Sequence, residues 1–220
     1  MLFRSSGVTY SQDGPLEPDS TDQAVKFDTT TDYADGGDVH DVGSADDLAV
    51  FMVVRIDDTA SGAIVSKMGI GGVYWYMDTA GSGTEISCQV RDGTTSYTNT
   101  ITGLVVGQWH VVGMVLDRSV DKLQVGQVAV IGSAAVATAL STTGCGQLLN
   151  SDAFRLGYHT SGIGNVDAAP VTFAGAYIAT GSGAASGMSA NLAAALEGLR
   201  DQLVDAVPPT FKNLLLMGCG

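Results

Sequence analysis

Closely spaced aspartates are the residues of this chain best suited to bind a metal ion. Asp32, Asp35 and Asp38 lie in a glycine-containing stretch that we predict to be a turn-rich loop. Calcium takes about six to eight hard oxygen ligands, which carboxylates and loop carbonyls can supply. The stretch lacks the glutamate that closes an EF-hand loop, so a second interpretation remains, in which these aspartates shape turns and stay in solvent. Calcium is the one cofactor that the sequence suggests.

Two tyrosines are the side chains best suited to stack on a sugar ring or on a partner protein. Tyr74 and Tyr76 flank Trp75 in a stretch with the composition of a β-strand. Successive side chains of a strand point to opposite faces, so the tyrosines share one face and Trp75 takes the other. Large aromatic side chains are mostly buried, so the alternative is that one side fills the core and the tyrosines are ordinary surface residues.

The sequence lacks the common catalytic motifs. It contains no G-x-S-x-G elbow, no H-E-x-x-H zinc site and no phosphate-binding G-x-x-x-x-G-K-[ST] loop. A glycosidase needs two carboxylates across a sugar cleft. The three glutamates, Glu17, Glu85 and Glu197, lie far apart in the chain. We therefore predict that the protein is not an enzyme.

The composition predicts a folded domain with an acidic surface. Hydrophobic residues make up 45% of the 220 residues and charged residues 15%, which is ample for a sizeable core. The formal net charge of -13 repels phosphate backbones, so we exclude nucleic acid as a partner. No apolar run reaches bilayer-spanning length, no signal peptide is recognisable, and we predict no membrane partner. The three cysteines show no C-x-x-C spacing, and Cys88 is predicted to be a small buried hydrophobe.

Short runs rich in β-branched and aromatic residues, separated by frequent turns, predict an all-β antiparallel sandwich. Asp92-Gly93 between two such runs is a hairpin turn signal. The run 48–56 is apolar almost throughout, so that strand should be covered on both faces. The predicted strands are 24–28, 48–56, 62–67, 73–77, 86–91, 96–101, 109–116, 122–130, 154–158 and 171–179.

One short helix is predicted near the C-terminus, at about residues 190–205. Ser189 or Asn191 can cap it, and Pro208-Pro209 follows it. We predict a jelly-roll domain at residues 23–206, between an N-terminal arm (1–22) and a C-terminal tail (207–220). The helix pattern rests on leucines at spacings of three and four, namely Leu192, Leu196, Leu199 and Leu203.

The strand-forming runs also carry motifs in a recognisable order. They are V-K-F-D-x-x-x-D-Y-A-D at 25–35, the run 48–56, I-V-S-K at 64–67, G-Q-W-H-x-V-x-x-V-x-D at 107–117, F-R-L-G at 154–157 and F-A-G-A-Y-I at 173–178. Together these motifs resemble the laminin-G-like, concanavalin-A-like jelly-roll family over roughly residues 24–203. The family is found in lectin-like modules and phage structural proteins, so the resemblance implies binding or structural roles. It also implies a structural role for His110, and alternation along the same strand predicts a buried Trp109.

Two functions fit these features. The first is a non-enzymatic structural or adhesion protein on the exterior of a larger assembly, for which we expect a bacteriophage virion, as a capsid decoration or a tail or fibre component. Its partners would be other structural proteins or further copies of itself. The alternative is a carbohydrate-binding, lectin-like module for surface glycans, with or without calcium, and an extracellular location. The apolar tail either folds back on the domain or docks on a neighbour through Phe211, Leu214, Leu215, Leu216 and Met217.

Overall fold

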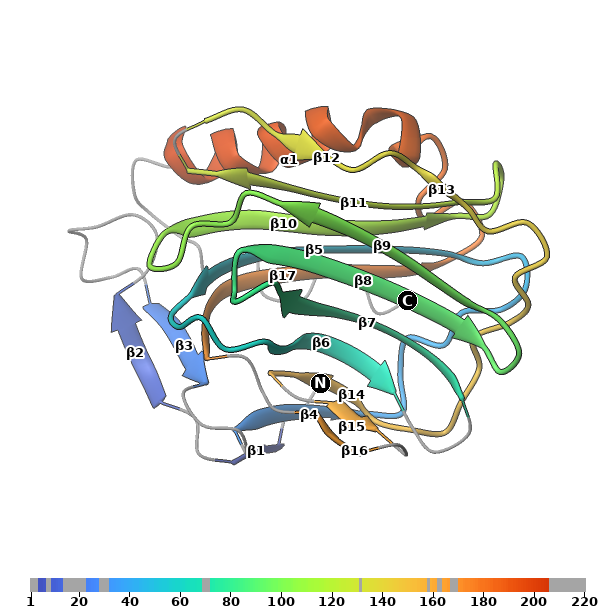
Figure 1. Ribbon diagram of the computed structural model, residues 1–220, viewed down its shortest axis with the longest axis horizontal. Helices are drawn as coiled ribbons and strands as arrows, with labels where there is room; N and C mark the ends of the chain where they lie inside the picture. The colour runs from blue at the N-terminus through green and yellow to red at the C-terminus, as the bar shows by residue number, and fades with distance from the viewer. Residues whose placement is uncertain are drawn as a thin grey trace.

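The computed structural model describes residues 4–6, 9–13, 23–27, 32–68, 72–130, 132–157, 159–161, 164–166 and 170–205. In this part of the chain, two antiparallel sheets pack face to face, and one helix lies on the outside (Figure 1). The all-β sandwich with one short C-terminal helix is thereby confirmed. The apolar tail residues Phe211, Leu214, Leu215, Leu216 and Met217 lie outside the described residues, so their role in assembly stays a prediction.

The first sheet has seven strands and carries the hairpins that the sequence predicts. The order across the sheet is β1 (Arg4–Ser6), β4 (Tyr33–Gly37), β14 (Phe154–Leu156), β6 (Gly62–Met68), β7 (Val73–Ala80), β8 (Glu85–Asp92) and β9 (Ser96–Thr102). Asp92 ends β8, and Gly93 begins the turn to β9 with a φ of 94° that favours glycine.

The second sheet has eight strands. Its order is β12 (Ala135–Val136), β11 (Lys122–Ala129), β10 (Trp109–Asp117), β5 (Asp47–Ile56), β17 (Val171–Gly181), β3 (Gln23–Phe27) and β2 (Thr9–Asp13), with β13 (Leu140–Ser141) also paired to β11. A separate hairpin of β15 (His159–Ser161) and β16 (Gly164–Val166) lies against β6. Both β1 and β2 pair with sheet strands, although the domain boundaries at residues 22 and 206 stay a prediction.

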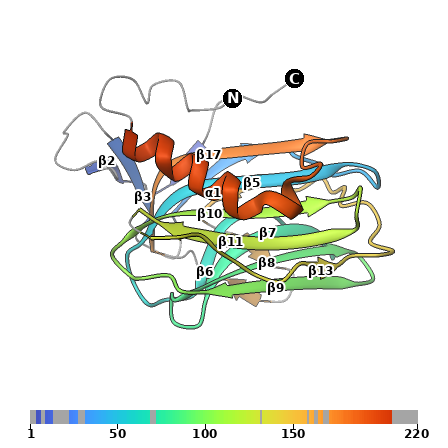
Figure 2. The same ribbon diagram turned by 90° about the horizontal axis from the view of Figure 1, so that it is seen from above.

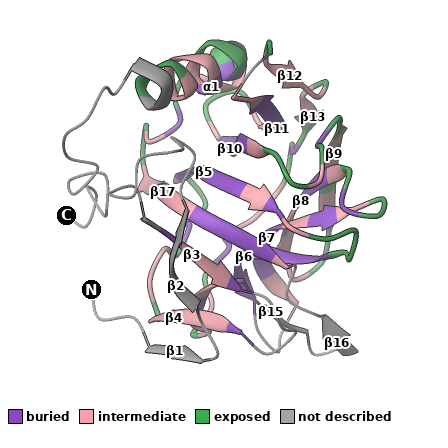
Figure 3. Ribbon diagram, turned by 90° about the vertical axis from the view of Figure 1, so that its left-hand side faces the viewer, coloured by how far each residue is buried: buried purple, intermediate pink, exposed green. Residues whose placement is uncertain are grey.

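The core lies between the sheets and follows the alternation of the strands. On β7, Trp75 and Met77 point inward and are fully buried. On β5, alternate residues enter this core while Ala49, Phe51 and Val53 point to the opposite side, so the predicted covering of both faces is confirmed. Figure 3 shows the buried strands between more exposed outer surfaces. Cys88 is buried in the core as predicted.

Helix α1 (Met188–Asp205) covers the outer face of the eight-stranded sheet over β10 and β11 (Figure 2). Leu192 and Leu196 are buried against that sheet. Paired glycines make the close approach possible, because a Cβ at Gly126 would lie 2.8 Å from the Leu196 Cδ1 atom. The helix begins earlier than predicted, and the Ser189 hydroxyl donates to Asp117 rather than capping it. In the part of the chain that is described, no helix is both long and apolar enough to cross a bilayer.

Two sequence predictions about this architecture were wrong. The aspartate-containing stretch is not a loop throughout, since residues 33–37 form β4 between β1 and β14. Trp109 is half-buried rather than buried, because strand parity places it on the helix side of the sheet, opposite Arg55. The Arg55 guanidinium carbon lies 5.3 Å from the centre of that ring. His110, one position on, points inward and is buried beside Gln127, as a structural residue should be.

Candidate functional site

Polar and aromatic side chains gather on the outer face of the seven-stranded sheet. Because Trp75 and Met77 point into the core, Tyr74, Tyr76 and Asp78 must point outward. In an antiparallel sheet, residues that pair directly point to the same face. The partners of these outward residues on β8, and their partners in turn on β9, therefore lie on the same outer face. We define the tyrosine face by these outward side chains, namely Tyr74, Tyr76, Asp78, Ser87, Gln89, Arg91 and Thr98.

The tyrosine face continues across the sheet as one transverse row. The row matters because it joins side chains from separate hairpins into a single polar strip, running from the edge near β4 to the edge at β9. In register order its members are Asp35, Arg155, Ser66, Tyr76, Gln89 and Thr98.

A glutamine holds the two tyrosines in place. The hydroxyls of Tyr74 and Tyr76 donate to the Gln89 Oε1 atom at 2.6 and 3.2 Å. The Gln89 amide nitrogen in turn donates to the Thr98 hydroxyl. The two rings lie with centroids 5.6 Å apart and an interplanar angle of 32°. Tyr74 is buried and Tyr76 is half-buried, so the ring of Tyr76 is the one within reach of a ligand.

A carboxyl group with an unpaired oxygen lies beside Tyr76. Burial raises the pKa of Asp78 to about 7, although the Ser87 hydroxyl and the backbone N–H of Asp78 itself lower it. The Asp78 Oδ1 atom is buried without a hydrogen-bond partner. Burial and the nearby Asp78 also raise the pKa of the Tyr76 hydroxyl, which therefore keeps its proton at neutral pH. This end of the face thus holds an acceptor oxygen to which no described residue donates.

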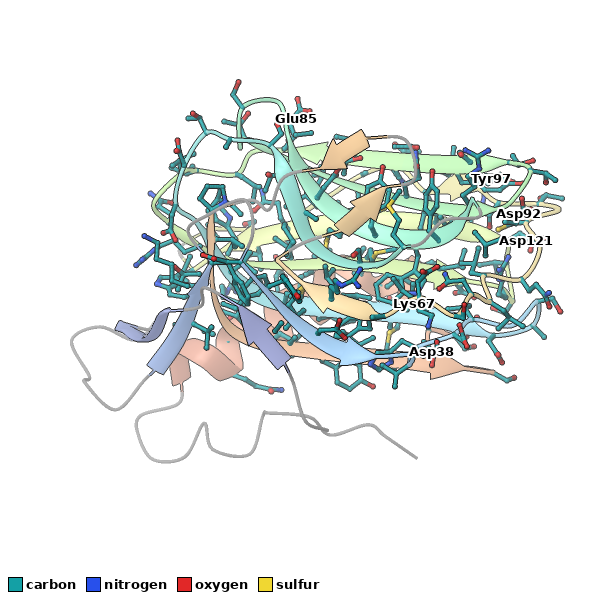
Figure 4. The ribbon with its side chains drawn as sticks, turned by 90° about the horizontal axis from the view of Figure 1, so that it is seen from below. Asp38, Lys67, Glu85, Asp92, Tyr97 and Asp121 are labelled. Carbon is teal, nitrogen blue, oxygen red and sulfur yellow. The ribbon has the colours of Figure 1, made fainter. Side chains whose placement is uncertain are left out.

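The turns at the two ends of β8 fix the register of the tyrosine face. At one end, the Asp92 carboxylate accepts hydrogen bonds from the backbone N–H groups of Thr94, Thr95 and Gly146. Burial alone would raise the pKa of Asp92, but these donors hold it well below its usual value. Figure 4 shows Asp92 near Tyr97 and Asp121 at this end, and Glu85 at the other. Asp92 is therefore a structural residue.

The predicted calcium ligands lie elsewhere, around β4, and two of them have cationic partners. The Asp35 carboxylate lies 3.5 Å from the Arg155 Nε atom. The Asp38 carboxylate lies 2.6 Å from the Nζ atom of Lys67. Figure 4 shows the two residues side by side. Lys67 has a fully buried side chain and is also within 3.3 Å of Asp41. The carboxylates of Asp38 and Asp41 therefore neutralise a cation of the chain itself.

Asp32, the third predicted ligand, is buried just before β4. Among the described residues, no three His, Cys, Asp or Glu side chains gather closely enough to hold a metal ion. The calcium hypothesis for Asp32, Asp35 and Asp38 stays a prediction, and their geometry adds no support to it.

The sequence identified the two tyrosines but not the polar side chains around them. Gln89, Arg91 and Asp78 gave no motif, because each is a single residue within its strand. The only feature of the sequence that could have indicated them is the alternation of side chains between the two faces of a strand. Once Asp92-Gly93 is taken as a hairpin turn, Gln89 and Arg91 share a face with Ser96 and Thr98.

Comparison with known proteins identifies the fold. No protein-family model matches the sequence, and no curated protein matches it either. The binding domain of Paraclostridial Mosquitocidal Protein 1 is similar in structure, with a TM-score of 0.58 and 8% identity over 90% of this chain and 46% of that chain. For the botulinum neurotoxin serotype D binding domain, the TM-score is 0.53 and the identity 10%, over 80% of this chain and 42% of that one.

A third similar structure is the CBM40 of the Ruminococcus gnavus IT-sialidase, solved with α2,3 sialyllactose bound. Its TM-score is 0.50 and its identity 12%, over 79% of this chain and 96% of that chain. This chain spans less than half the length of these two binding domains. At such low identity the likeness shows the fold alone. That fold is the laminin-G-like, concanavalin-A-like jelly roll that the motifs predicted.

Proposed function

We propose that this domain is a non-enzymatic glycan-binding module and that the tyrosine face is its binding surface. The observation that carries the proposal is the pair of tyrosines fixed by Gln89. An aromatic ring presents an apolar surface and a polar tip, which suits the mixed apolar and hydroxyl character of a sugar. Both tyrosine hydroxyls donate to Gln89, which fixes the orientation of the two rings.

The surroundings of the tyrosines support the same proposal. Ligand sites combine apolar and aromatic surface with a small number of fixed polar groups. Here Gln89 and Thr98 lie on one side of Tyr76, and the unpaired oxygen of Asp78 lies further along the strand. The fold adds support, since two similar structures are binding domains and a third holds sialyllactose.

Isothermal titration of the protein with a panel of oligosaccharides that includes α2,3-sialyllactose and lactose tests the proposal. We expect Tyr76→Ala to weaken binding about tenfold or more, which corresponds to ~1.4 kcal/mol. Val120→Ala is the control, because Val120 is 53% exposed in the turn between β10 and β11 of the other sheet. The bound sugar should remain intact on prolonged incubation. Equal losses in both variants, or no binding by the unaltered protein, would refute the proposal.

We propose further that the domain is displayed on the exterior of a larger assembly, a bacteriophage virion, and that copies of it associate through β17. The supporting observation is that, among the described residues, no strand pairs with the outer edge of β17 beyond Phe173. β17 pairs with β5 along its length but with β3 only at Val171–Phe173. Residues 174–181 carry no charged side chain. Edge strands are commonly protected by charges or proline, and two antiparallel copies of one edge form a self-complementary interface.

Light scattering during size exclusion tests the assembly proposal. We expect concentration-dependent dimers that Tyr177→Lys abolishes. Val120→Lys is the control, since Val120 is 53% exposed in the turn between β10 and β11, away from that edge. A monomer at every concentration would exclude association through this edge. Mass spectrometry of purified virions tests the location, and absence of the chain from them would exclude it.

A further inference from the structure

One arginine on the tyrosine face differs from the other arginines whose side chains the structure describes. Arg55, Arg155 and Arg200 each lie within 4 Å of a carboxylate. Arg118 donates to the backbone carbonyls of Cys145 and Gly146. Among the described residues, Arg91 has neither an ion pair nor a hydrogen bond, and its Nε atom is buried without a partner. An unpaired cation is unexpected in a chain with a net charge of -13.

The position of Arg91 is set by the sheet. It pairs with Tyr74 on β7 and with Ser96 on β9, so it points out from the sheet on the same side as the tyrosines. The backbone of Gly72 lies against its guanidinium group, where a Cβ would be 3.6 Å from the Nε atom. Gly72 has a φ of 75°, a backbone conformation that favours glycine. A Cβ at residue 72 would make only ordinary van der Waals contact with the guanidinium, so the backbone conformation, and not the arginine, calls for glycine there.

The neighbouring acids do not explain Arg91. Asp92 precedes the turn, and its carboxylate is occupied by backbone donors and the Thr94 hydroxyl. Asp78 pairs with Ser87, four residues along β8 from Arg91, which is about 13 Å at the rise of a β-strand. The face therefore has a donor group at one end, an aromatic ring in the middle and an acceptor oxygen at the other end.

We propose that Arg91 binds the carboxylate of an acidic sugar whose ring packs on Tyr76. This inference rests on the proposed glycan-binding function and names the class of glycan. The planar guanidinium matches a carboxylate with two parallel N–H···O hydrogen bonds. Arg91 lies two residues from Gln89, the partner of Tyr76, so the two groups are about 7 Å apart along the strand. The carboxylate lies at Arg91, and hydroxyls of the same ligand point toward Asp78.

Titration with matched acidic and neutral sugars tests this inference. The probes are α2,3-sialyllactose against lactose, and trigalacturonate against neutral galactotriose. We expect at least one acidic sugar to bind tenfold or more tightly than its neutral counterpart. Arg91→Gln should remove that preference while changing the affinity for the neutral sugar less than twofold. Arg91→Lys should restore part of it, because lysine keeps the charge but not the planar fork.

Arg200→Gln is the charge-matched control, since Arg200 lies on α1 beyond the other sheet, and it should behave like the unaltered protein. If neutral and acidic sugars bind equally, or if Arg91→Gln keeps the preference, the role of Arg91 is excluded while the glycan-binding function stands. If none of the four sugars binds, the proposed function fails and this inference fails with it.

Discussion

The two sheets of this sandwich have outer faces of opposite character. The face of the eight-stranded sheet is apolar over β10 and β11, where helix α1 covers it with Leu192 and Leu196 over the glycine pair Gly113 and Gly126. The face of the seven-stranded sheet carries tyrosines, amides and charged groups, including the unpaired Arg91. One face is satisfied by packing within the chain, whereas the other keeps hydrogen-bonding groups without partners.

The helix-covered face contributes to the stability of the fold, whereas the tyrosine face is the one that we propose binds a ligand. Close packing on the helix side leaves no room for a ligand, since even a methyl group at Gly126 would contact Leu196. On the tyrosine face, buried donors and acceptors without partners cost stability. Such groups are retained where a ligand supplies the missing bonds, which is the role that we propose for this face. Substitutions on the two faces should therefore have different consequences.

The largest effect should come from the core that both faces share. Trp75→Ala should lower the free energy of unfolding by about 3–5 kcal/mol, because the fully buried ring leaves a cavity. Trp109→Ala should cost about 1–2 kcal/mol, since that ring is only half-buried. Urea unfolding of both variants measures the difference. Equal losses would contradict the assignment of Trp75 to the core and Trp109 to the rim of the helix-covered face.

An intermediate effect is expected beneath the helix. Gly126→Ala should destabilise the protein by about 1–3 kcal/mol, because its Cβ would lie 2.8 Å from Leu196 and 3.1 Å from the carbonyl oxygen of Ala135. Gly198→Ala is the matched control. No atom lies within 4 Å of that Cβ position on α1, so the change should stabilise the helix by up to about 1 kcal/mol. Thermal unfolding compares the two, and a neutral Gly126→Ala would show that the helix packs more loosely than described.

A third effect should be a pH dependence of stability, which arises on the tyrosine face. The pKa of Asp78 is about 7 in the folded chain, against 3.8 for the free group. The folded state therefore holds this proton more tightly than the unfolded state, and its contribution to stability is lost as pH rises from about 4 to about 7.

Asp78→Asn should remove the loss of stability between about pH 4 and pH 7, because asparagine does not titrate. Relative to the unaltered protein, the variant should gain stability with rising pH over that window, by no more than about 1.4 kcal/mol per pH unit. Chemical denaturation between pH 4 and pH 8 measures the difference between the two proteins. A difference that stays constant with pH would show that Asp78 is ionised throughout, and that its environment is wetter than the structure indicates.

The sequence predicted the fold because the fold depends on local patterns. The apolar run of β5 and the turn at Asp92-Gly93 were readable from composition and spacing. β4 was missed because aspartate and glycine are disfavoured in strands. Pairing with β14 overrides that preference, and the pairing is not visible in residues 33–37 themselves.

The candidate site was only partly predictable. Tyr74 and Tyr76 were identified from alternation within one strand. The alignment of Arg91 with Tyr74 depends on the turn between β7 and β8, where Gly81, Ser82 and Gly83 all take positive φ values. Nothing in the local sequence fixes that turn, so the register of β7 and β8, and with it the composition of the tyrosine face, required the structure.

Mapping of the bound sugar by NMR tests the central claim most directly. In a titration of the ¹⁵N-labelled protein with α2,3-sialyllactose, we expect shifts of the backbone amides of β7, β8 and β9, centred on Tyr76 and Gln89. The amides of α1, β10 and β11 should stay unchanged, since the helix closes that face. Shifts confined to the helix side, or no shifts at millimolar sugar, would contradict the assignment of glycan binding to the tyrosine face.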